Sequence, residues 1–248
     1  MNKAWPVLRR AVDGSLSILY PVRCIVCGEV QPYGEADFVC DRCKAHLPAV
    51  PKRTCGKCGR GIQYADEICS DCKGEAFAFV RGYVLYPYTD AVSAMLLRYK
   101  GGGHTSAAKG IAFLLAARFP LDGLPDIDCM MPVPSNRAKD RRRGFNHTKL
   151  LVRRLAALYG LPVDCDALYA ARHTKKQSGL SAGERRLNVK GAYAVRNAAA
   201  VAGKTILLFD DVFTTGSTMN ACAEALMEAG ARVVYVMAVA ASVREPRG

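Results

Sequence analysis

The sequence predicts an α/β fold with a mostly parallel sheet, preceded by a small module held together by metal. Beyond about residue 77, short apolar runs alternate with amphipathic helix patterns, as in parallel strands that are joined by helices. Before that point, eight of the 11 cysteines form four CxxC pairs. The chain has 248 residues, half of them hydrophobic, so it can bury a sizeable core and still carry a second small unit.

An amphipathic helix is expected in residues 1–22, because apolar side chains recur there at helical spacing. These side chains are Trp5, Leu8, Val12, Leu16 and Leu19. We expect this helix to pack on the body of the protein or on a second copy, and the sequence leaves the oligomeric state open. No apolar run reaches about 18 residues, so no membrane span is expected. A signal peptide is not expected either, and a cytoplasmic location follows.

The four CxxC pairs predict a double zinc ribbon over residues 23–76. One CxxC turn can direct two sulfurs at one ion, and two such turns complete a tetrahedral structural Zn²⁺ site. In sequence order the ligand sets are Cys24, Cys27, Cys40 and Cys43, and Cys55, Cys58, Cys69 and Cys72. Pairing the first turn with the third stays open, but the sequential sets make each unit a closed ribbon. Disulfides are rare in a cytoplasmic chain.

Residues 77–248 are expected to form the α/β domain. The predicted strands are 80–88, 128–133, 205–209 and 233–240. The predicted helices are 91–98, 106–119, 146–159 and 219–229. The isolated cysteines at 129, 165 and 222 lie in apolar surroundings, which favours core packing over chemistry.

The stretch from the predicted strand 205–209 into the following helix is the strongest indication of function. Two carboxylates end the strand, and a polar turn leads to the helix. The carboxylates are Asp210 and Asp211, and the turn is Thr214, Thr215, Gly216, Ser217 and Thr218. Ligands bind at the carboxyl ends of parallel strands, and helix N-termini bind anions. Gly216 allows a close backbone approach or a positive φ. A simple helix cap explains only one or two of these residues.

This stretch resembles the 5-phosphoribosyl-1-pyrophosphate (PRPP) motif of type I phosphoribosyltransferases. The resemblance implies that Asp210 and Asp211 hold the ribose hydroxyls and that the turn holds the 5′-phosphate. It predicts the fold more specifically than the activity, because some proteins of this fold bind the ligand only to regulate. The sequence after Gly101–Gly103 lacks the Lys-Ser/Thr of a P-loop, which disfavours a nucleoside triphosphatase.

The net charge of +13 is concentrated in residues 136–190, where 14 Lys and Arg against 4 Asp and Glu leave +10. Such a segment suits a polyphosphate or a nucleic acid, although a solvated surface is the simpler alternative. One loop in it follows the predicted strand 128–133 and carries Ser135, Asn136, Arg137 and Arg143 at the sheet edge of Asp210. Arginines there could fork onto a pyrophosphate.

The second basic loop, residues 172–188, carries Lys175 and Lys176. We expect it to be long and structureless, as lids often are.

Together these motifs resemble the ComF family of competence-associated proteins. In order they are four CxxC pairs, Pro-Val-Pro at 132–134, Arg-Gly-Phe-Asn at 143–146, Thr-Lys-Lys-Gln at 174–177 and the PRPP motif. The family joins a double zinc ribbon to a phosphoribosyltransferase domain. His147 departs from its pattern, which usually has Gln there; as a general base this histidine is a weak candidate.

The resemblance implies a protein that binds PRPP with Mg²⁺ and transfers the phosphoribosyl group. Single-stranded DNA and proteins of the competence machinery are the implied partners, in natural transformation. The alternative is a DNA-handling protein that only senses PRPP. The scarcity of aromatic residues within the basic segment speaks against a dedicated single-strand groove.

Overall fold

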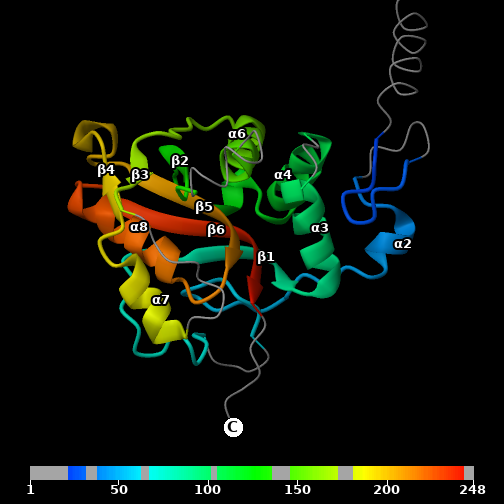
Figure 1. Ribbon diagram of the computed structural model, residues 1–248, viewed down its shortest axis with the longest axis horizontal. Coiled ribbons are helices and arrows are strands. Elements are labelled where there is room, and N and C mark those ends of the chain that lie inside the picture. Colours follow the sequence, from blue (N-terminus) through cyan, green and yellow to red (C-terminus); the bar gives the residue numbers. More distant parts are fainter. Residues whose placement is uncertain are drawn as a thin grey trace, which may run out of the picture.

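A four-stranded parallel sheet forms the centre of the protein. The computed structural model describes residues 22–31, 38–62, 67–101, 105–135, 146–172 and 181–242. The sheet has the order β1-β6-β5-β2 (Figure 1). The strands are β1 (Gly82–Tyr88), β2 (Cys129–Pro132), β5 (Thr205–Phe213) and β6 (Val233–Ser242). These are the four strands that the sequence predicts.

Helices cover both faces of the sheet, as apolar strands of this kind require. On one face lie α3 (Asp90–Gly101), α4 (Thr105–Arg118) and α6 (His147–Tyr159). On the other lies α8 (Ser217–Glu228). The alternation of β5 explains this arrangement, because Leu207 and Phe209 join the first core cluster whereas Ile206 and Leu208 join the second.

A smaller antiparallel pair, β3 (Leu168–Ala170) with β4 (Tyr193–Val195), lies beside α8. The segment between these strands contains α7 (Ala182–Val189). The expectation of a structureless loop over 172–188 is therefore wrong for the part that α7 occupies. Ser181 and Glu184 form a reciprocal capping box, with donor–acceptor distances of 3.3 and 2.7 Å, and this box begins the helix.

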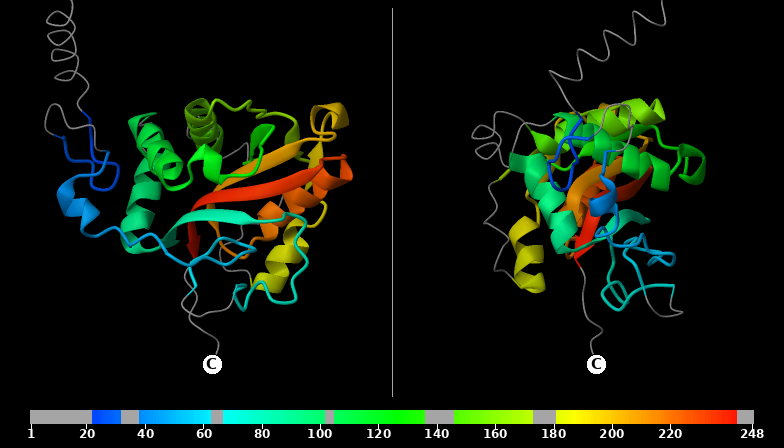
Figure 2. Two further views of the ribbon diagram at one scale, coloured as in Figure 1. Left: turned by 180° about the vertical axis from the view of Figure 1, so that it is seen from behind. Right: turned by 90° about the vertical axis from the view of Figure 1, so that its right-hand side faces the viewer.

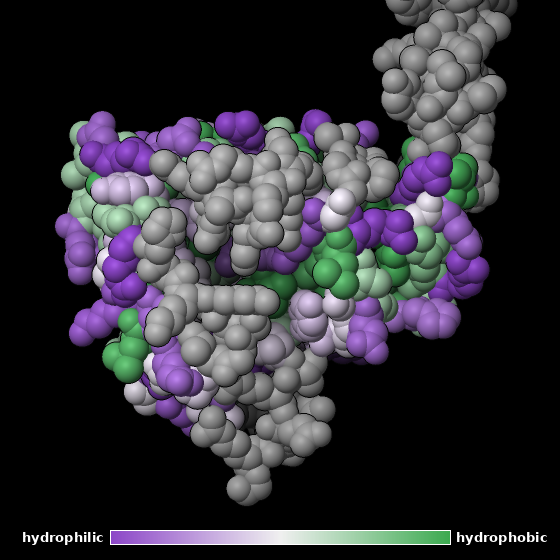
Figure 3. All heavy atoms as spheres, in the orientation of Figure 1, coloured by the Kyte–Doolittle hydropathy of each residue, from purple (hydrophilic) through white to green (hydrophobic). Residues whose placement is uncertain are grey.

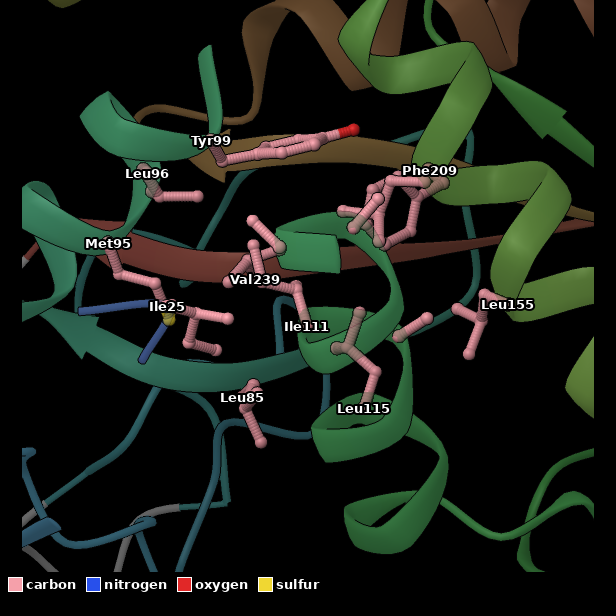
Figure 4. Packing of buried hydrophobic residues seen from close by; sticks show 14 of the residues in the cluster. Ile25, Leu85, Met95, Leu96, Tyr99, Ile111, Leu115, Leu155, Phe209 and Val239 are labelled. Carbon is pink, nitrogen blue, oxygen red and sulfur yellow. The ribbon is translucent and has the colours of Figure 1, made fainter. Parts of the chain in front are cut away.

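The two zinc ribbons pack on different faces of the sheet. The first ribbon includes α2 (Asp41–Lys44), and its Ile25 lies among Leu85, Met95 and Ile111 of the first core cluster (Figure 4). Cys55, Cys58 and Cys72 of the second ribbon belong to the second cluster, with residues of β5 and α8. The cysteine module is thus part of both cores and not an appendage.

The short 3-10 helices η1 (Leu121–Gly123) and η2 (Ala198–Ala200) complete the regular structure of the described residues. On the face seen in Figure 3, apolar residues gather over α3 and the first ribbon, and Leu97 of α3 is 64% exposed. No helix among the described ranges is long and apolar enough to cross a membrane. Residues 1–21 of the helix expected in residues 1–22 lie outside these ranges.

Candidate functional site

The eight paired cysteines converge in two groups of four. The groups are Cys24, Cys27, Cys40 and Cys43, and Cys55, Cys58, Cys69 and Cys72, with all sulfurs of a group within 4.8 Å of one another. The Cys27 and Cys40 sulfurs are 3.8 Å apart, and those of Cys58 and Cys69 are 3.7 Å apart. A tetrahedron with Zn–S bonds of about 2.3 Å has edges of about 3.8 Å. The geometry therefore fits two structural zinc ions held by the sequential sets.

Backbone N–H groups point at the sulfurs, as expected for thiolates that bind a metal. The N–H of Cys40 donates to Cys24 Sγ at 3.4 Å, and the N–H of Cys69 donates to Cys55 Sγ at 3.3 Å. Burial opposes ionisation of Cys24, but hydrogen bonds from the backbone of Val26, Cys27 and Cys40 and from the Cys27 side chain together lower its pKa to about 6. Four thiolates leave no open coordination position, so both sites are structural and not catalytic.

Asp210 and Asp211 lie inside β5, and this differs from the prediction that the strand ends at residue 209. The parallel ladder continues to the pairs Val212 with Ala240 and Phe213 with Ala241. Aspartate is disfavoured in strands, but here pairing with the long strand β6 overrides that preference. The polar turn is therefore shorter than expected, with α8 beginning at Ser217.

The two carboxylates face opposite sides of the sheet, as neighbours on a strand do. Asp211 is 9% exposed and forms an ion pair with Lys100, the penultimate residue of α3. Asp210 lies toward β4 and α8, where burial raises the pKa of Tyr193 and of Cys222 and the charge of Asp210 adds to the rise. The acids therefore form two acceptor positions, and among the described residues Asp211 is the one that forms an ion pair with Lys100.

The carboxyl group of Asp210 ionises with difficulty. Burial raises its pKa from 3.8 to about 7, and the positive charge of Lys100 offsets only part of that rise. One of its oxygens, Oδ1, accepts the N–H of Asp211 at 2.8 Å. A carboxyl group that is half protonated near neutral pH, next to a ligand-type turn, is typical of functional sites.

The turn has the geometry of an anion site at a helix N-terminus. Gly216 is the N-cap residue of α8 and has a φ of +78°, in the left-handed region. The Thr215 and Ser217 hydroxyls are 2.8 Å apart, so one of their two protons is used within the turn. Backbone N–H groups at the start of α8 are the main donors that the turn can offer to a phosphate.

We predict that Gly216→Val destabilises the protein by about 1–3 kcal/mol and disrupts the turn, because it combines left-handed strain with a clash. A Cβ at this position would lie 2.6 Å from the Phe213 ring and 3.2 Å from that of Phe77. Gly160→Val is a matched control, because Gly160 has a φ of +66° but no atom within 4 Å of an added Cβ. Urea unfolding should show the larger loss for Gly216→Val, and equal losses would contradict the clash.

Ser135 lies where the first basic loop begins, at the sheet edge that carries the acids. Pro132 of β2 pairs with Phe209 of β5, so Ser135 follows β2 at the level of Asp211 and beyond. Asn146, the N-cap of α6, donates from its side-chain amide to the Ser135 hydroxyl at 2.5 Å. The two ends of the loop thus meet at this edge. Asn136, Arg137 and Arg143, like Lys175 and Lys176 of the second loop, lie outside the described residues.

His147 is packed as a structural residue. It is 8% exposed, its ring makes an edge contact with the Tyr99 ring at 6.1 Å, and its carbonyl accepts the Tyr99 hydroxyl. This environment does not suit a general base, in agreement with the prediction that His147 is a weak candidate for that role.

The sequence does not predict three residues near the site, namely Lys100, Tyr193 and Arg60. Lys100 directly precedes Gly101–Gly103, but nothing in the local sequence indicates that it pairs with Asp211. The sequence gives no signal for Tyr193 either, because only the folded chain brings it near enough for the charge of Asp210 to act on it. Arg60 follows the third CxxC turn, and its guanidinium donates to the carbonyl of Thr214, which is 154 residues further along the chain.

Two family models match the chain. Residues 15–73 match the double zinc ribbon domain, and residues 141–247 match the phosphoribosyl transferase domain. Both agree with the ligand groups and with the sheet described above.

Curated relatives cover most of the chain. The DNA utilization protein YhgH of Salmonella typhi is 30% identical over 200 residues, or 78% of this chain and 87% of that protein. Competence protein F of Haemophilus influenzae is 28% identical over 82% of this chain and 90% of its own length. Competence protein ComFC of Bacillus subtilis is 26% identical over 77% and 79%.

Solved structures are more distant. The allosteric regulatory enzyme of purine biosynthesis matches at a TM-score of 0.39 and 20% identity, over 57% of this chain and 29% of that one. An adenine phosphoribosyltransferase matches at 0.35 and 17% identity, over 58% and 75%.

Proposed function

Because the chain belongs to the ComF family, which joins a double zinc ribbon to a phosphoribosyltransferase-type domain, we propose that it binds PRPP with Mg²⁺ at the β5–α8 turn. The observation that carries this proposal is the placement of Asp210 and Asp211 on β5 directly before an N-terminal anion site at Gly216. Acceptors for sugar hydroxyls and donors for a phosphate thus lie a few residues apart.

In this proposal the 5′-phosphate binds at the turn formed by Thr214, Thr215, Gly216, Ser217 and Thr218. The ribose hydroxyls donate to Asp210 and Asp211. Lys100 holds Asp211 in place through its ion pair and adds positive charge near the pyrophosphate. Ser135, Asn136, Arg137, Arg143, Lys175 and Lys176 are the remaining proposed contacts to the pyrophosphate. The donor set suits Mg²⁺, which prefers substrate oxygens with few carboxylates and neutralises pyrophosphate charge when bound.

The proposed reaction is transfer of the phosphoribosyl group to a nitrogen nucleophile. The bond between C1 and the pyrophosphate oxygen breaks, and its electron pair leaves with pyrophosphate. The nucleophile then bonds to C1 and gives up its proton to the released pyrophosphate or to water. Asp210 and Asp211 stabilise the positive charge that develops on the sugar, and the cationic side chains stabilise the leaving group. Release of pyrophosphate on addition of candidate amines and nucleobases tests for transfer.

The pKa of Asp210 predicts how binding depends on pH. Because burial raises this pKa from 3.8 to about 7, the carboxyl group is mostly protonated below pH 7 and ionised above it. The ionised form is the stronger acceptor for ribose hydroxyls, so affinity for PRPP·Mg²⁺ should fall as the pH drops from 8 to 6. Asp210→Asn cannot ionise, and the ratio of wild-type to variant affinity should rise about tenfold over this range.

Phosphate groups of the ligand titrate in both proteins, so the ratio cancels their effect. Calorimetric titrations at pH 6, 7 and 8 measure it. A ratio that stays constant would mean that Asp210 does not contact the ligand in its ionised form.

A second function is favoured by the names of the relatives, which are competence and DNA utilization proteins. We propose that the chain takes part in DNA uptake and that PRPP regulates its binding to single-stranded DNA through the +10 segment at 136–190. Affinity for an oligonucleotide, measured against salt with and without PRPP, tests this role. A flat salt dependence would exclude the basic segment as the binding surface.

A further inference from the structure

Arg60 connects the second zinc ribbon to the phosphate turn. Its guanidinium donates to the backbone carbonyl of Thr214 at 2.7 Å and pairs with Asp71 at 2.6 Å. The Arg60 side chain is only 11% exposed. The Ser242 hydroxyl, at the end of β6, donates to the same Thr214 carbonyl at 3.2 Å. In Figure 2 the second ribbon, in cyan, passes beside the carboxyl ends of β5 and β6.

Arg60 and Asp71, which form the charged pair, both lie beside cysteines of the second ligand group. Asp71 lies between the ligands Cys69 and Cys72, and the carbonyl of Arg60 accepts the N–H of Cys55 at 2.7 Å. A charged pair in which both members are fixed by one metal site loses little conformational freedom when it forms. The orientation of the Arg60 side chain therefore depends on the second zinc site.

The ribbon is itself fixed to the sheet. The N–H of Gly82, the first residue of β1, donates to the Lys57 carbonyl at 2.7 Å. The backbones approach so closely that a Cβ at Gly59 would lie 2.2 Å from the Gly82 carbonyl oxygen. Behind the turn, Phe79 stacks on Phe77 at 4.8 Å and contacts the Phe213 ring at 6.2 Å. The backbone of the second ribbon next to Arg60 is therefore fixed against the sheet.

Fixing the Thr214 carbonyl also orients the next N–H group. The peptide bond between Thr214 and Thr215 is planar and trans, so the carbonyl and the Thr215 N–H point in opposite directions. A carbonyl that is bound by Arg60 and Ser242 directs that N–H away from the zinc ribbon. In the proposed complex this N–H is one of the donors of the phosphate cradle.

We propose that Arg60 is a positioning residue for phosphate binding, and that the second zinc ribbon serves to hold the β5–α8 turn in its binding conformation. This inference rests on the proposed PRPP site and adds a role that the ribbon plays in it. The ligand group concerned is the 5′-phosphate, and the pyrophosphate end of PRPP is independent of Arg60.

Arg60→Met tests the inference by separating the two ends of the ligand. One hydrogen bond to a charged group corresponds to a loss of about tenfold or more in affinity. We expect that loss for PRPP·Mg²⁺ and for ribose 5-phosphate, with unchanged affinity for Mg²⁺-pyrophosphate. Arg60→Lys retains the charge but not the planar fork, and its affinities should lie between those of wild type and Arg60→Met.

Arg118→Met is the matched control. Arg118 also donates to a backbone carbonyl of the cysteine module, that of Pro51 at 3.3 Å, but no contact with the turn is described for it. It should bind all three ligands as the wild type does. Zinc content and thermal unfolding of each variant show whether the ribbon is intact, and where Arg60→Met does not fold, Arg60→Lys is the variant that decides.

The outcomes distinguish this inference from the proposed function. A selective loss of ribose 5-phosphate and PRPP affinity supports the positioning role. Equal affinities, or an equal loss for pyrophosphate and ribose 5-phosphate, would overturn it while the PRPP site stands. If wild-type protein with both zinc ions binds neither PRPP nor ribose 5-phosphate, the proposed function fails and this inference with it.

Discussion

Cys55→Ser is expected to leave one zinc ion per chain and to unfold the protein at temperatures at which the wild type is folded. Cys55 is fully buried, in the core cluster that also contains Phe79, Leu208 and Cys222. A structural zinc site contributes about 10–16 kcal/mol in small zinc-binding domains. That is as large as the whole free energy of unfolding of a typical protein, about 5–15 kcal/mol.

The effect should extend beyond the ribbon, because the second zinc site is built into the same cluster as β5 and α8. Metal analysis and thermal unfolding measured together test this prediction. Cys165→Ser is the control, since Cys165 is buried but belongs to neither ligand group. A Cys55→Ser protein with one zinc ion and a melting temperature within a few degrees of wild type would show that the ribbon is dispensable for the fold.

Asp211→Asn is expected to reduce the affinity for PRPP·Mg²⁺ by about 100-fold or more, which corresponds to about 2.7 kcal/mol. The substitution keeps the shape of the side chain but removes its charge and one acceptor. It also removes the ion pair with Lys100, whose side chain is 24% exposed. Stability should therefore fall as well, by about 1–3 kcal/mol.

A double variant separates the two effects. Adding Lys100→Met to Asp211→Asn removes both members of the ion pair, so stability should fall by less than the sum of the two single losses, and binding should not be restored. Asp166→Asn is the control, because Asp166 also pairs with a lysine, Lys149 at 2.6 Å, but is 80% exposed and is not one of the proposed ligand contacts. If Asp211→Asn bound PRPP·Mg²⁺ with full affinity, the Asp211 carboxylate would not be a contact of the ligand.

The sequence predicted those parts of the molecule that depend on local pattern. Apolar runs and helical spacing placed the four strands of the central sheet and the helices α3, α4, α6 and α8. The CxxC turns identified both zinc ligand groups, because each turn sets the positions of two sulfurs by itself. The positive φ of Gly216 follows from the same kind of local reasoning.

The sequence did not predict the features that depend on distant partners. The strand β5 continues through Asp210 and Asp211 because β6 supplies the ladder as far as Phe213, against the local preference of aspartate. Lys100 and Arg60 contact the site from α3 and from the second ribbon. Their proximity to the site cannot be inferred from their spacing along the chain. The helix α7 could have been predicted from the sequence, since Ser181 and Glu184 form a recognisable capping box.

The cysteine module is an integral part of the protein and not a separate metal-bound unit. Its two ribbons contribute to the cores on opposite faces of the sheet, and the second one contacts the carbonyl of Thr214. The proposed ligand site is thus assembled from three parts of the chain: the β5–α8 turn, the end of α3 and the second ribbon.

The most direct test of the account is calorimetric titration of the zinc-loaded wild-type protein with PRPP in the presence of Mg²⁺. We predict saturable binding of one PRPP per chain, competed by ribose 5-phosphate and abolished or greatly weakened in Asp211→Asn. Absence of binding by wild-type protein that contains two zinc ions and unfolds cooperatively would contradict the assignment of the β5–α8 turn as a phosphoribosyl site.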